Sequence, residues 1–262
     1  MNRAGVAGWA LAALLVAVCL APWLAPYAPD TLDLANRRAA PSAAHWFGTD
    51  DLGRDLLSRV LFGGQVSLAV GLLSALVAGG IGVGVGAASG YFGGAVDAGL
   101  MRFTDAALSV PRLLLLMVAS AVLAPSIPLL VVLVGIVGWM ETARVTRAAV
   151  MGAREREFVL AARAAGAGSA RIVARHLLPV AAPAMAVAAT LAVGRAILLE
   201  SALSFFGVGV QPPAASWGAM LYQAQSAMST EPWLALVPGT FIFVTVAAIN
   251  AIGDRLAESR IS

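Results

Sequence analysis

The sequence predicts an all-α integral membrane protein whose chain crosses the bilayer six times. Two observations lead to this fold class. Of the 262 residues, 60% are apolar and 12% are charged, whereas soluble domains average about 45–50% and about 25%. The apolar residues also form uncharged stretches of the roughly 20 residues that a helix needs to span hydrocarbon, where only helices and closed barrels satisfy their backbone groups.

The first uncharged stretch lies between Arg3 and Asp30. Its 26 residues reach about 39 Å as a helix with a rise of about 1.5 Å per residue. A cleaved signal peptide is the alternative, because a basic residue precedes the apolar run, but this run is longer than the usual core of about 7–15 residues. We therefore expect a transmembrane helix and the start of the first outer loop within residues 1–45.

The second stretch, between Arg59 and Asp97, is rich in glycine. Gly82 and Gly86 form a GxxxG pair, and such small residues let helix backbones approach closely in lipid. This pattern favours a helix in the interior of a bundle. It is weaker evidence for a specific dimer face, because glycines are frequent throughout the chain.

Four more segments complete the predicted set of six. The third carries Arg102, Asp105 and Arg112 in its first half, and Pro125 and Pro128 indicate a turn after it. The four segments run approximately over Leu100–Ala124, Ile127–Arg147, Val180–Ser204 and Trp233–Gly253. An even number of crossings places both ends of the chain on one side of the membrane.

The arginines predict that both termini face the cytoplasm, because short cytoplasmic loops are enriched in positive charge. With this orientation, the outer loops hold Arg37, Arg38, Arg54 and Arg59. The inner segments hold Arg3, Arg102, Arg144, Arg147, Arg154, Arg156, Arg163, Arg171, Arg175, Arg255 and Arg260. Four tryptophans then lie near the outer interface, as an aromatic belt requires: Trp23, Trp46, Trp217 and Trp233.

Residues 148–179 form the longest inner connection, and their pattern predicts a helix, a bend and a second helix. An apolar face repeats at i, i+3, i+4 and i+7 from Phe158 to Ala165. Gly166 and Gly168 end this helix, Ser169 caps the next one, and Pro179 ends the segment where the next crossing begins. From the pattern alone, a partner protein, an anionic lipid surface and a solvated loop all remain possible.

This segment resembles the signature loop of ABC-importer permeases, described as EAA, three residues, Gly, nine residues and I-x-L-P. The matching residues are Ala161, Ala162, Gly166, Leu178 and Pro179. Leu160 stands where the family often has Glu, and His176 where it often has Ile. Glu157, one helical turn before Leu160, is a partial substitute for the missing carboxylate.

Two further stretches narrow the resemblance. Residues 47–68, FGTDDLGRDLLSRVLFGGQVSL, and residues 200–221, ESALSFFGVGVQPPAASWGAML, resemble hallmark sequences of C-type permeases in the oligopeptide, dipeptide and nickel importer family. The resemblance implies a type I ABC importer permease fold, with a core domain over 46–262 that holds five membrane helices and the EAA-type loop at 157–179. It also implies a multi-pass protein of the bacterial inner membrane.

The resemblance implies function and partners as well. The chain would form half of the translocation pathway for di- or oligopeptides, with nickel or another small solute as the alternative cargo. Its partners would be a B-type permease, two cytoplasmic ATPase subunits that bind ATP and Mg, an extracytoplasmic substrate-binding protein and membrane lipid. The inner loop would hold cytoplasmic coupling helices between the fourth and fifth crossings. Its coupling residues would be Glu157, Ala161, Ala162, Arg163, Gly166, Leu178 and Pro179.

Composition excludes several chemistries on this chain itself. All 17 basic residues are arginine, so there is no Gly-Lys-Ser/Thr phosphate loop and no lysine Schiff base. A formal charge of +3 gives no nucleic-acid footprint. Cys19 has no disulfide partner, and with His45 and His176 it makes a poor metal set. We expect no cofactor, no metal and no nucleic-acid partner on this chain.

Polar residues within the fifth segment are the candidates to line the pathway: Arg195, Glu200, Ser201 and Ser204. Charged groups are costly in a membrane and therefore suggest function. Arg195 is the strongest of these candidates, because it would neutralise the carboxylate of a peptide. On the fourth segment, Glu141 and Arg144 have the i, i+3 spacing of a structural ion pair.

The segment GTDDLGRD holds three carboxylates, at Asp50, Asp51 and Asp55. Carboxylates suit hard cations, but a capped turn that leads into a helix is the favoured interpretation. The alternatives from other classes are an ion-driven secondary transporter, for which we find no internal repeat, and an intramembrane serine protease. The protease would pair Ser201 or Ser204 with His176, which the helical rise separates by roughly 37 Å.

Overall fold

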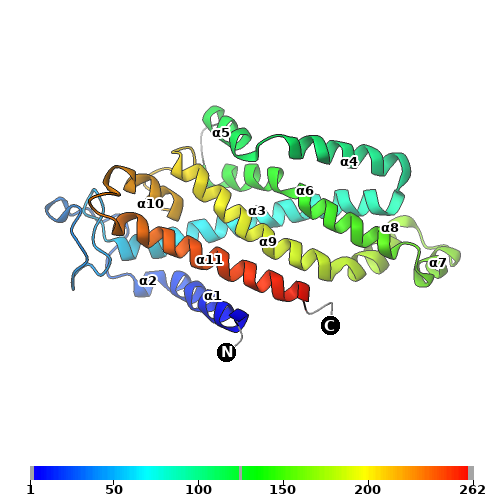
Figure 1. The fold of residues 1–262 in the computed structure, drawn as a ribbon, viewed down its shortest axis with the longest axis horizontal. Helices are drawn as coiled ribbons and strands as arrows, with labels where there is room; N and C mark the ends of the chain where they lie inside the picture. Colours follow the sequence, from blue (N-terminus) through cyan, green and yellow to red (C-terminus); the bar gives the residue numbers. More distant parts are fainter. Residues whose placement is uncertain (1–2, 124–125, 259–262) are drawn as a thin grey trace.

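A computed structural model describes residues 3–123 and 126–258, and within these ranges the chain is helical with irregular connections (Figure 1). Pro125, from the predicted turn, and Arg260 lie outside the described residues. In chain order the elements are α1 (Arg3–Cys19), α2 (Ala21–Leu24), η1 (Leu34–Asn36), α3 (Leu56–Phe92), α4 (Gly94–Ser109), α5 (Arg112–Val122), α6 (Ile127–Ala153), α7 (Glu157–Ala164), α8 (Ser169–Ile172), the π-helical turn η2 (Val173–Leu177), α9 (Leu178–Phe205), α10 (Trp217–Ala224), η3 (Gln225–Ala227) and α11 (Trp233–Glu258).

The long helices run lengthwise in one elongated bundle (Figure 1). The loop between α2 and α3 lies with α10 at one end of the bundle, and α7 and α8 lie at the other. Helices α3, α6 and α9 pack against one another, and α11 packs on α9 and α1. Helices α4 and α5 lie along the outside of α6.

Four helical runs among the described residues are long and apolar enough to cross a membrane: α3, α6, the continuous run Ser169–Phe205, and α11. They correspond to the second, fourth, fifth and sixth predicted crossings. The first predicted crossing contains the shorter apolar helix α1. The total of six crossings, with both termini inside, stays a prediction.

The third predicted crossing, Leu100–Ala124, is not one straight helix. Helices α4 and α5 are bent by 78° relative to each other. The bend falls at Val110 and Pro111, where the backbone is extended and not helical. Proline has no N–H to continue a helical ladder and disfavours helical geometry in the preceding residue. The segment therefore counts as a fifth span only if the bent pair crosses as one unit.

Glycines of α3 bring its backbone directly against α6. A Cβ atom at Gly82 would lie 2.7 Å from the carbonyl oxygen of Trp139, and one at Gly90 would lie 2.8 Å from that of Arg147. A Cβ at Gly86, between them, would collide with the carbonyl oxygen of Ala143. The prediction that the Gly82–Gly86 pair belongs to an interior helix is thus confirmed.

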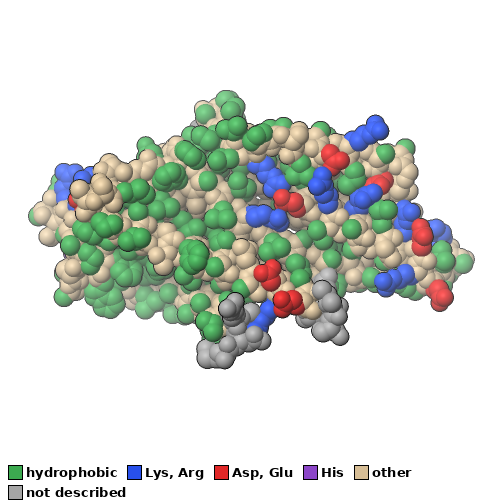
Figure 2. Space-filling view, viewed as in Figure 1, with side chains coloured by type: hydrophobic (Ala, Val, Ile, Leu, Met, Phe, Trp, Pro, Cys, Tyr) green, Lys and Arg blue, Asp and Glu red, His purple; other side chains and the backbone are tan. Residues whose placement is uncertain are grey.

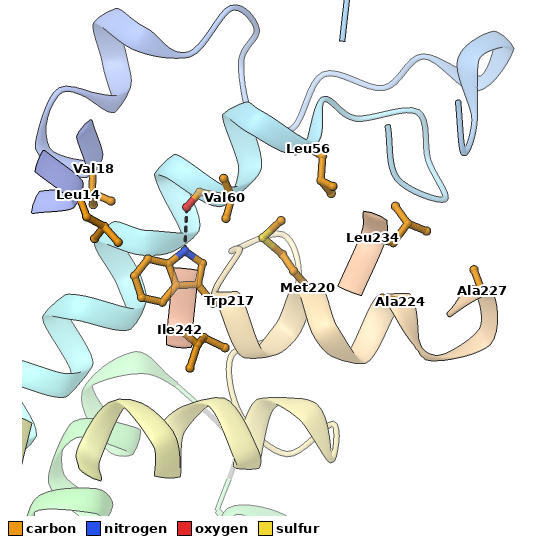
Figure 3. Close-up of a cluster of buried hydrophobic side chains, with 10 residues drawn as sticks. All are labelled: Leu14, Val18, Leu56, Val60, Trp217, Met220, Ala224, Ala227, Leu234 and Ile242. Atoms are coloured by element: carbon orange, nitrogen blue, oxygen red, sulfur yellow. Dashed lines mark hydrogen bonds between the residues drawn. The ribbon is translucent and has the colours of Figure 1, made fainter. Parts of the chain in front are cut away.

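A buried tryptophan joins four helices at the α10 end of the bundle (Figure 3). Trp217 is fully buried, and its Nε1–H donates to the carbonyl oxygen of Val60 on α3 at 2.9 Å. Leu14 and Val18 of α1 and Ile242 of α11 belong to the same cluster. Trp217 is therefore a core residue, and its predicted place in an exposed aromatic belt is wrong.

The other predicted belt residues differ in exposure. Trp23 and Trp46 are exposed, at 78% and 69%, as a belt requires. Trp233 is half-buried, and its Nε1 has no hydrogen-bond partner among the described residues. Of the four predicted belt residues, Trp23 and Trp46 are therefore the two with the expected exposure.

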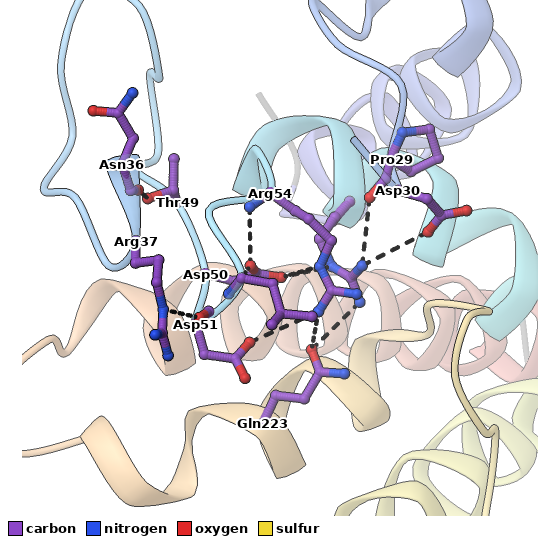
Figure 4. A network of polar contacts seen from close by, with 11 residues as sticks. Pro29, Asp30, Asn36, Arg37, Thr49, Asp50, Asp51, Arg54 and Gln223 are labelled. Carbon is purple, nitrogen blue, oxygen red and sulfur yellow. Dashed lines mark hydrogen bonds and ion pairs between the residues drawn. The ribbon is translucent and has the colours of Figure 1, made fainter. Parts of the chain in front are cut away.

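The loop before α3 is held by a network of buried charges (Figure 4) and by a helix cap. The Asp50 carboxylate accepts from Arg54 Nε at 2.7 Å and lies 3.3 Å from Arg59 Nε. Gln223 Oε1 of α10 accepts from both guanidinium groups, at 3.4 and 3.3 Å. Asp55 is the N-cap of α3 and accepts from the Ser58 N–H at 2.8 Å. These bonds confirm the capped turn as the structure of this segment.

We predict that Gly86→Ala lowers the free energy of unfolding by about 1–3 kcal/mol, because the new methyl group overpacks the contact between α3 and α6. The measurement is the thermal unfolding midpoint of the purified protein in detergent. The matched control is Gly84→Ala on the same helix, where a Cβ meets nothing within 4 Å. Equal midpoints for the two variants would contradict the assignment of this contact.

Candidate functional site

Helices α7 and α8 form a short hairpin that protrudes from one end of the bundle (Figure 1). One side of α7 anchors it: Val159 is fully buried and packs in a cluster with Val150, Ile172 and Leu177. Ala162, one turn later, is half-buried against the same cluster. The hairpin is thus fixed to the ends of α6 and α9.

The bend between α7 and α8 requires a glycine. Gly166 has φ +80°, a left-handed conformation that side chains with a Cβ disfavour. The Gly166 N–H donates to Arg163 O and the Ala167 N–H to Ala162 O, both at 3.0 Å. This pair of bonds is the Schellman motif, in which glycine takes the left-handed position after the helix. The predicted end of the first inner helix at Gly166 is confirmed.

The second inner helix differs from the prediction in two ways. Ser169 is its first residue and not its cap, which is Gly168; the Ser169 hydroxyl lies 3.3 Å from Tyr91 Oη. Pro179 does not end the segment, because the helical run continues from Ser169 to Phe205. The π turn makes this possible: the Leu178 N–H donates to Val173 O, a wider register that accommodates a proline lacking an N–H.

The outer side of the hairpin carries most of the residues that are predicted to couple this chain to the ATPase subunits. Glu157, Ala161 and Arg163 are exposed, and the Arg163 guanidinium lies 5.9 Å from the centre of the Tyr91 ring. Phe158 and Leu160 are exposed large apolar side chains, at 39% and 50%.

The remaining predicted coupling residues lie where the hairpin joins α9: Leu178 is half-buried and Pro179 is exposed. The hairpin is therefore a projection fixed at its base, and its outer side is largely exposed in the part of the chain that the structure describes.

Ion pairs connect the bent helices α4 and α5 to α6. Arg147 on α6 donates twice to Asp97 on α4, at 2.5 Å each, and Arg144 donates to Asp105 at 2.5 Å. The Arg144 and Asp105 side chains are 51% and 59% exposed. Charged side chains gather over α4, α6 and α9 in Figure 2. We name the following residues the charged strip: Asp97, Asp105, Arg112, Glu141, Arg144, Arg147 and Arg195.

Glu141 is shared by two arginines and does not pair with Arg144. Arg112 Nη2 donates to Glu141 Oε1 at 2.8 Å, and Arg195 Nη1 lies 3.1 Å from Glu141 Oε2. The expected ion pair within α6 is therefore wrong, because α4 and α5 supply nearer partners for both residues. Together the three side chains line a small pocket between α3, α6 and α9, with Ser74 on its α3 side.

Glu200, Ser201 and Ser204 are buried, at 0%, 6% and 2% exposure. The Glu200 carboxylate accepts from Ser204 at 2.8 Å and from Ser67 of α3 at 3.1 Å. Ser67 also accepts from the Trp217 N–H at 3.1 Å. In this conformation their side chains cannot contact a solute, because they are enclosed between α9, α3 and α10. Of the four predicted pathway residues, Arg195 alone has an exposed side chain, at 40%.

The structure does not bring together the residues that the protease alternative would need. His176 and Ser201 lie on one continuous helical run, which separates them by roughly 37 Å. Among the described residues, no three His, Cys, Asp or Glu side chains are grouped to hold a metal ion.

The sequence alone places Arg112 and Asp105 in the first half of the third predicted crossing, and it does not predict their place in the charged strip. A sequence signal was present in the spacing of Glu141, Arg144 and Arg147, which puts three charged residues three apart along α6.

We predict that Ser67→Ala lowers the free energy of unfolding by about 1–3 kcal/mol. The substitution removes one hydrogen-bond partner from the buried Glu200 carboxylate and one from the buried Trp217 N–H. Thermal unfolding of the purified protein in detergent provides the measurement. Ser109→Ala, at an exposed site where the hydroxyl donates only to Ala106 O, is the control. A Ser67 variant as stable as this control would show that the network contributes little.

Comparison with known proteins places the chain in a family. Residues 80–260 match the family model described as the binding-protein-dependent transport system inner membrane component. Residues 1–41 match the N-terminal transmembrane domain of oligopeptide transport permease C.

Three relatives cover nearly the whole chain. A Brucella suis protein provisionally named a peptide permease is 43% identical over 98% of this chain and 86% of its own length. The oligopeptide transport system permease OppC of Haemophilus influenzae is 37% identical over 98% of this chain and 84% of its own length. The dipeptide transport system permease DppC of Bacillus subtilis is 37% identical over 98% of this chain and 81% of its own length. The chain is therefore a multi-pass protein of the bacterial inner membrane and belongs to the family of binding-protein-dependent transport system inner membrane components.

Proposed function

We propose that this chain is the permease subunit of an ATP-driven importer and forms half of a translocation pathway for peptides. The observation that carries the proposal is the charged strip, whose side chains are partly or fully exposed although four of them lie on α6 and α9, which are long and apolar enough to cross the membrane. Charged groups do not face lipid and instead line water-filled cavities or partner subunits. The second half of the pathway would come from a B-type permease that covers this face.

The α7–α8 hairpin is the proposed coupling element. Its anchored side, at Val159, joins it to α6 and α9, while Glu157, Ala161 and Arg163 are exposed. A short helix that lies in a groove of an ATPase subunit transmits displacement well, because packed helices move as units. The small side chains of Ala161, Ala162 and Gly166 would allow close docking, with Leu178 and Pro179 linking the docked hairpin to α9.

The proposed complex contains two ATPase subunits, which would bind ATP and Mg, and a substrate-binding protein outside the membrane. With both termini inside, the α10 end would meet the binding protein. This end is well suited to docking, because the capped turn and the buried charges around Arg59 hold its loops in one shape. Nickel or another small solute is the alternative cargo, and the ligand retained by the copurified binding protein would identify it.

We predict that ATPase subunits copurify with this chain and that the reconstituted complex takes up peptide only while ATP is supplied. The measurement is uptake of a labelled dipeptide into proteoliposomes, with ATP depletion and an uncoupler as separate treatments. ATP depletion should stop uptake, whereas the uncoupler should leave it unchanged. Uptake that persists without ATP and stops with the uncoupler would instead indicate an ion-driven secondary transporter.

We predict that Gly166→Trp gives a complex that assembles poorly or hydrolyses ATP without transport, because the bulky side chain blocks docking and strains the bend. Copurified ATPase and peptide uptake are measured together. Gly166→Ala separates the two causes, since it adds strain of about 1 kcal/mol but little volume.

Gly99→Trp on α4 controls for bulk, because Gly99 is exposed and a Cβ there meets nothing within 4 Å. Normal uptake together with normal ATPase stimulation in Gly166→Trp would contradict the proposed coupling role.

A further inference from the structure

No described residue accepts a hydrogen bond from the Arg195 guanidinium. Its nearest acidic partner, Glu141 Oε2, lies 3.1 Å from Nη1, yet this oxygen accepts no hydrogen bond from any described residue. Glu141 instead accepts from Arg112 at 2.8 Å through its other oxygen. The Arg195 side chain is 40% exposed. Arg195 is therefore held near a carboxylate without being hydrogen-bonded to it.

This site lies deep along the helices. Glu141 is about 21 Å from the start of α6, and Arg195 is about 25 Å from the start of the antiparallel α9, at a rise of about 1.5 Å per residue. Both residues are thus near the middle of a span of about 30 Å or more. An exposed cation at this depth needs water or an anion beside it.

Small side chains leave space next to the guanidinium. The pocket lined by Arg112, Glu141 and Arg195 is bounded by Gly138 on α6 and by Ala192 and Ala196 on α9. None of these neighbours carries a charge. Among the residues that line this pocket, Arg112, Glu141 and Arg195 are the charged ones, and they contribute two positive charges and one negative charge.

We propose that Arg195 binds a carboxylate of the solute as it passes through the membrane, with Glu141 as the resting partner that the solute replaces. This inference rests on the proposed function, because it assigns a subsite within the proposed pathway. A guanidinium fork matches a carboxylate with two parallel hydrogen bonds. Once a carboxylate is bound at Arg195, Glu141 stays with Arg112, and the group holds two positive and two negative charges.

The same arrangement keeps the binding weak, as passage requires. Glu141 remains beside Arg195 and competes with the solute, so a bound carboxylate is not trapped. A conducting pathway needs sites that are favourable enough to enter and weak enough to leave. Every peptide with a free C-terminus carries such a carboxylate, whatever its side chains. Arg195 thus serves cargo of varied sequence.

Equilibrium binding to the whole complex in nanodiscs tests the proposal. The complex contains both permeases and the ATPase subunits but no binding protein, so selection by that protein does not enter. Three probes are compared by saturation-transfer NMR: alanyl-alanine, its C-terminal amide, and alanyl-aspartic acid α-amide. The first carries the terminal carboxylate, the second carries none, and the third carries only a side-chain carboxylate.

We expect the wild-type complex to bind alanyl-alanine at least about tenfold more tightly than the amide, because the amide has no anionic partner for the guanidinium. Arg195→Gln should remove this preference. Arg195→Lys should keep part of it, since lysine retains the charge but not the fork. Arg102→Gln, an exposed arginine of α4 outside the charged strip, is the matched control and should bind like the wild type.

A second variant keeps the test informative if Arg195→Gln fails to assemble. Glu141→Gln removes the competing carboxylate, so alanyl-alanine should bind several-fold more tightly while the amide is unaffected. Tight binding of the third probe would extend the site to side-chain carboxylates, and weak binding would restrict it to the peptide terminus. Either result upholds a carboxylate site.

Equal binding of alanyl-alanine and its amide to the wild type would overturn the inference. An unchanged preference in Arg195→Gln, or unchanged acid binding in Glu141→Gln, would overturn it too. If the same complex, supplied with the binding protein and ATP, still took up peptide, the carboxylate site alone would be contradicted and the proposed function would stand. Absence of any ATP-dependent uptake with the binding protein present would instead overturn the proposed function.

Discussion

The close contact between α3 and α6 is the constraint on which the rest of the bundle depends. Apolar surfaces gain little by leaving lipid for one another, so membrane helices associate through close packing. Gly82, Gly86 and Gly90 provide it, because without a Cβ they let α3 approach the backbone of α6. This contact also sets the rotation of α6. Thr142 and Ala143 are buried, and the neighbouring Arg144 is exposed.

The chain satisfies carboxylates within its spans in two contrasting ways. Glu200 is enclosed and accepts from serine hydroxyls of α3 and α9, which ties these helices to the loop before Trp217. Glu141 is partly exposed and lies between two arginines from different helices. A fully bonded buried network rigidifies its surroundings, whereas an exposed ion pair exchanges partners readily because water screens it. The first arrangement stabilises the fold, and the second leaves room for a solute.

The two ends of the bundle are rigid for different reasons. At the α10 end, Asp50, Arg54 and Arg59 form a buried ionic network that lies under the loop before α3. At the other end, the Schellman motif at Gly166 and the buried Val159 fix the angle of the α7–α8 hairpin. Fixed shapes at both ends suit a subunit that meets one partner protein at each. Between them, α4 and α5 are bent by 78° at Val110 and Pro111.

The sequence by itself determined which segments are helical and apolar, the glycine bend at Gly166 and the family, because these depend on composition and local spacing. It could not determine the partners of the charges within the spans. Glu141 has Arg144 within helical reach, yet the structure brings it Arg112 and Arg195, which lie 29 and 54 positions away. Nor could the sequence show that Trp217 and Glu200 are enclosed, since burial depends on which helices surround a residue. Partner choice and burial arise from helix packing, so only the tertiary structure decided them.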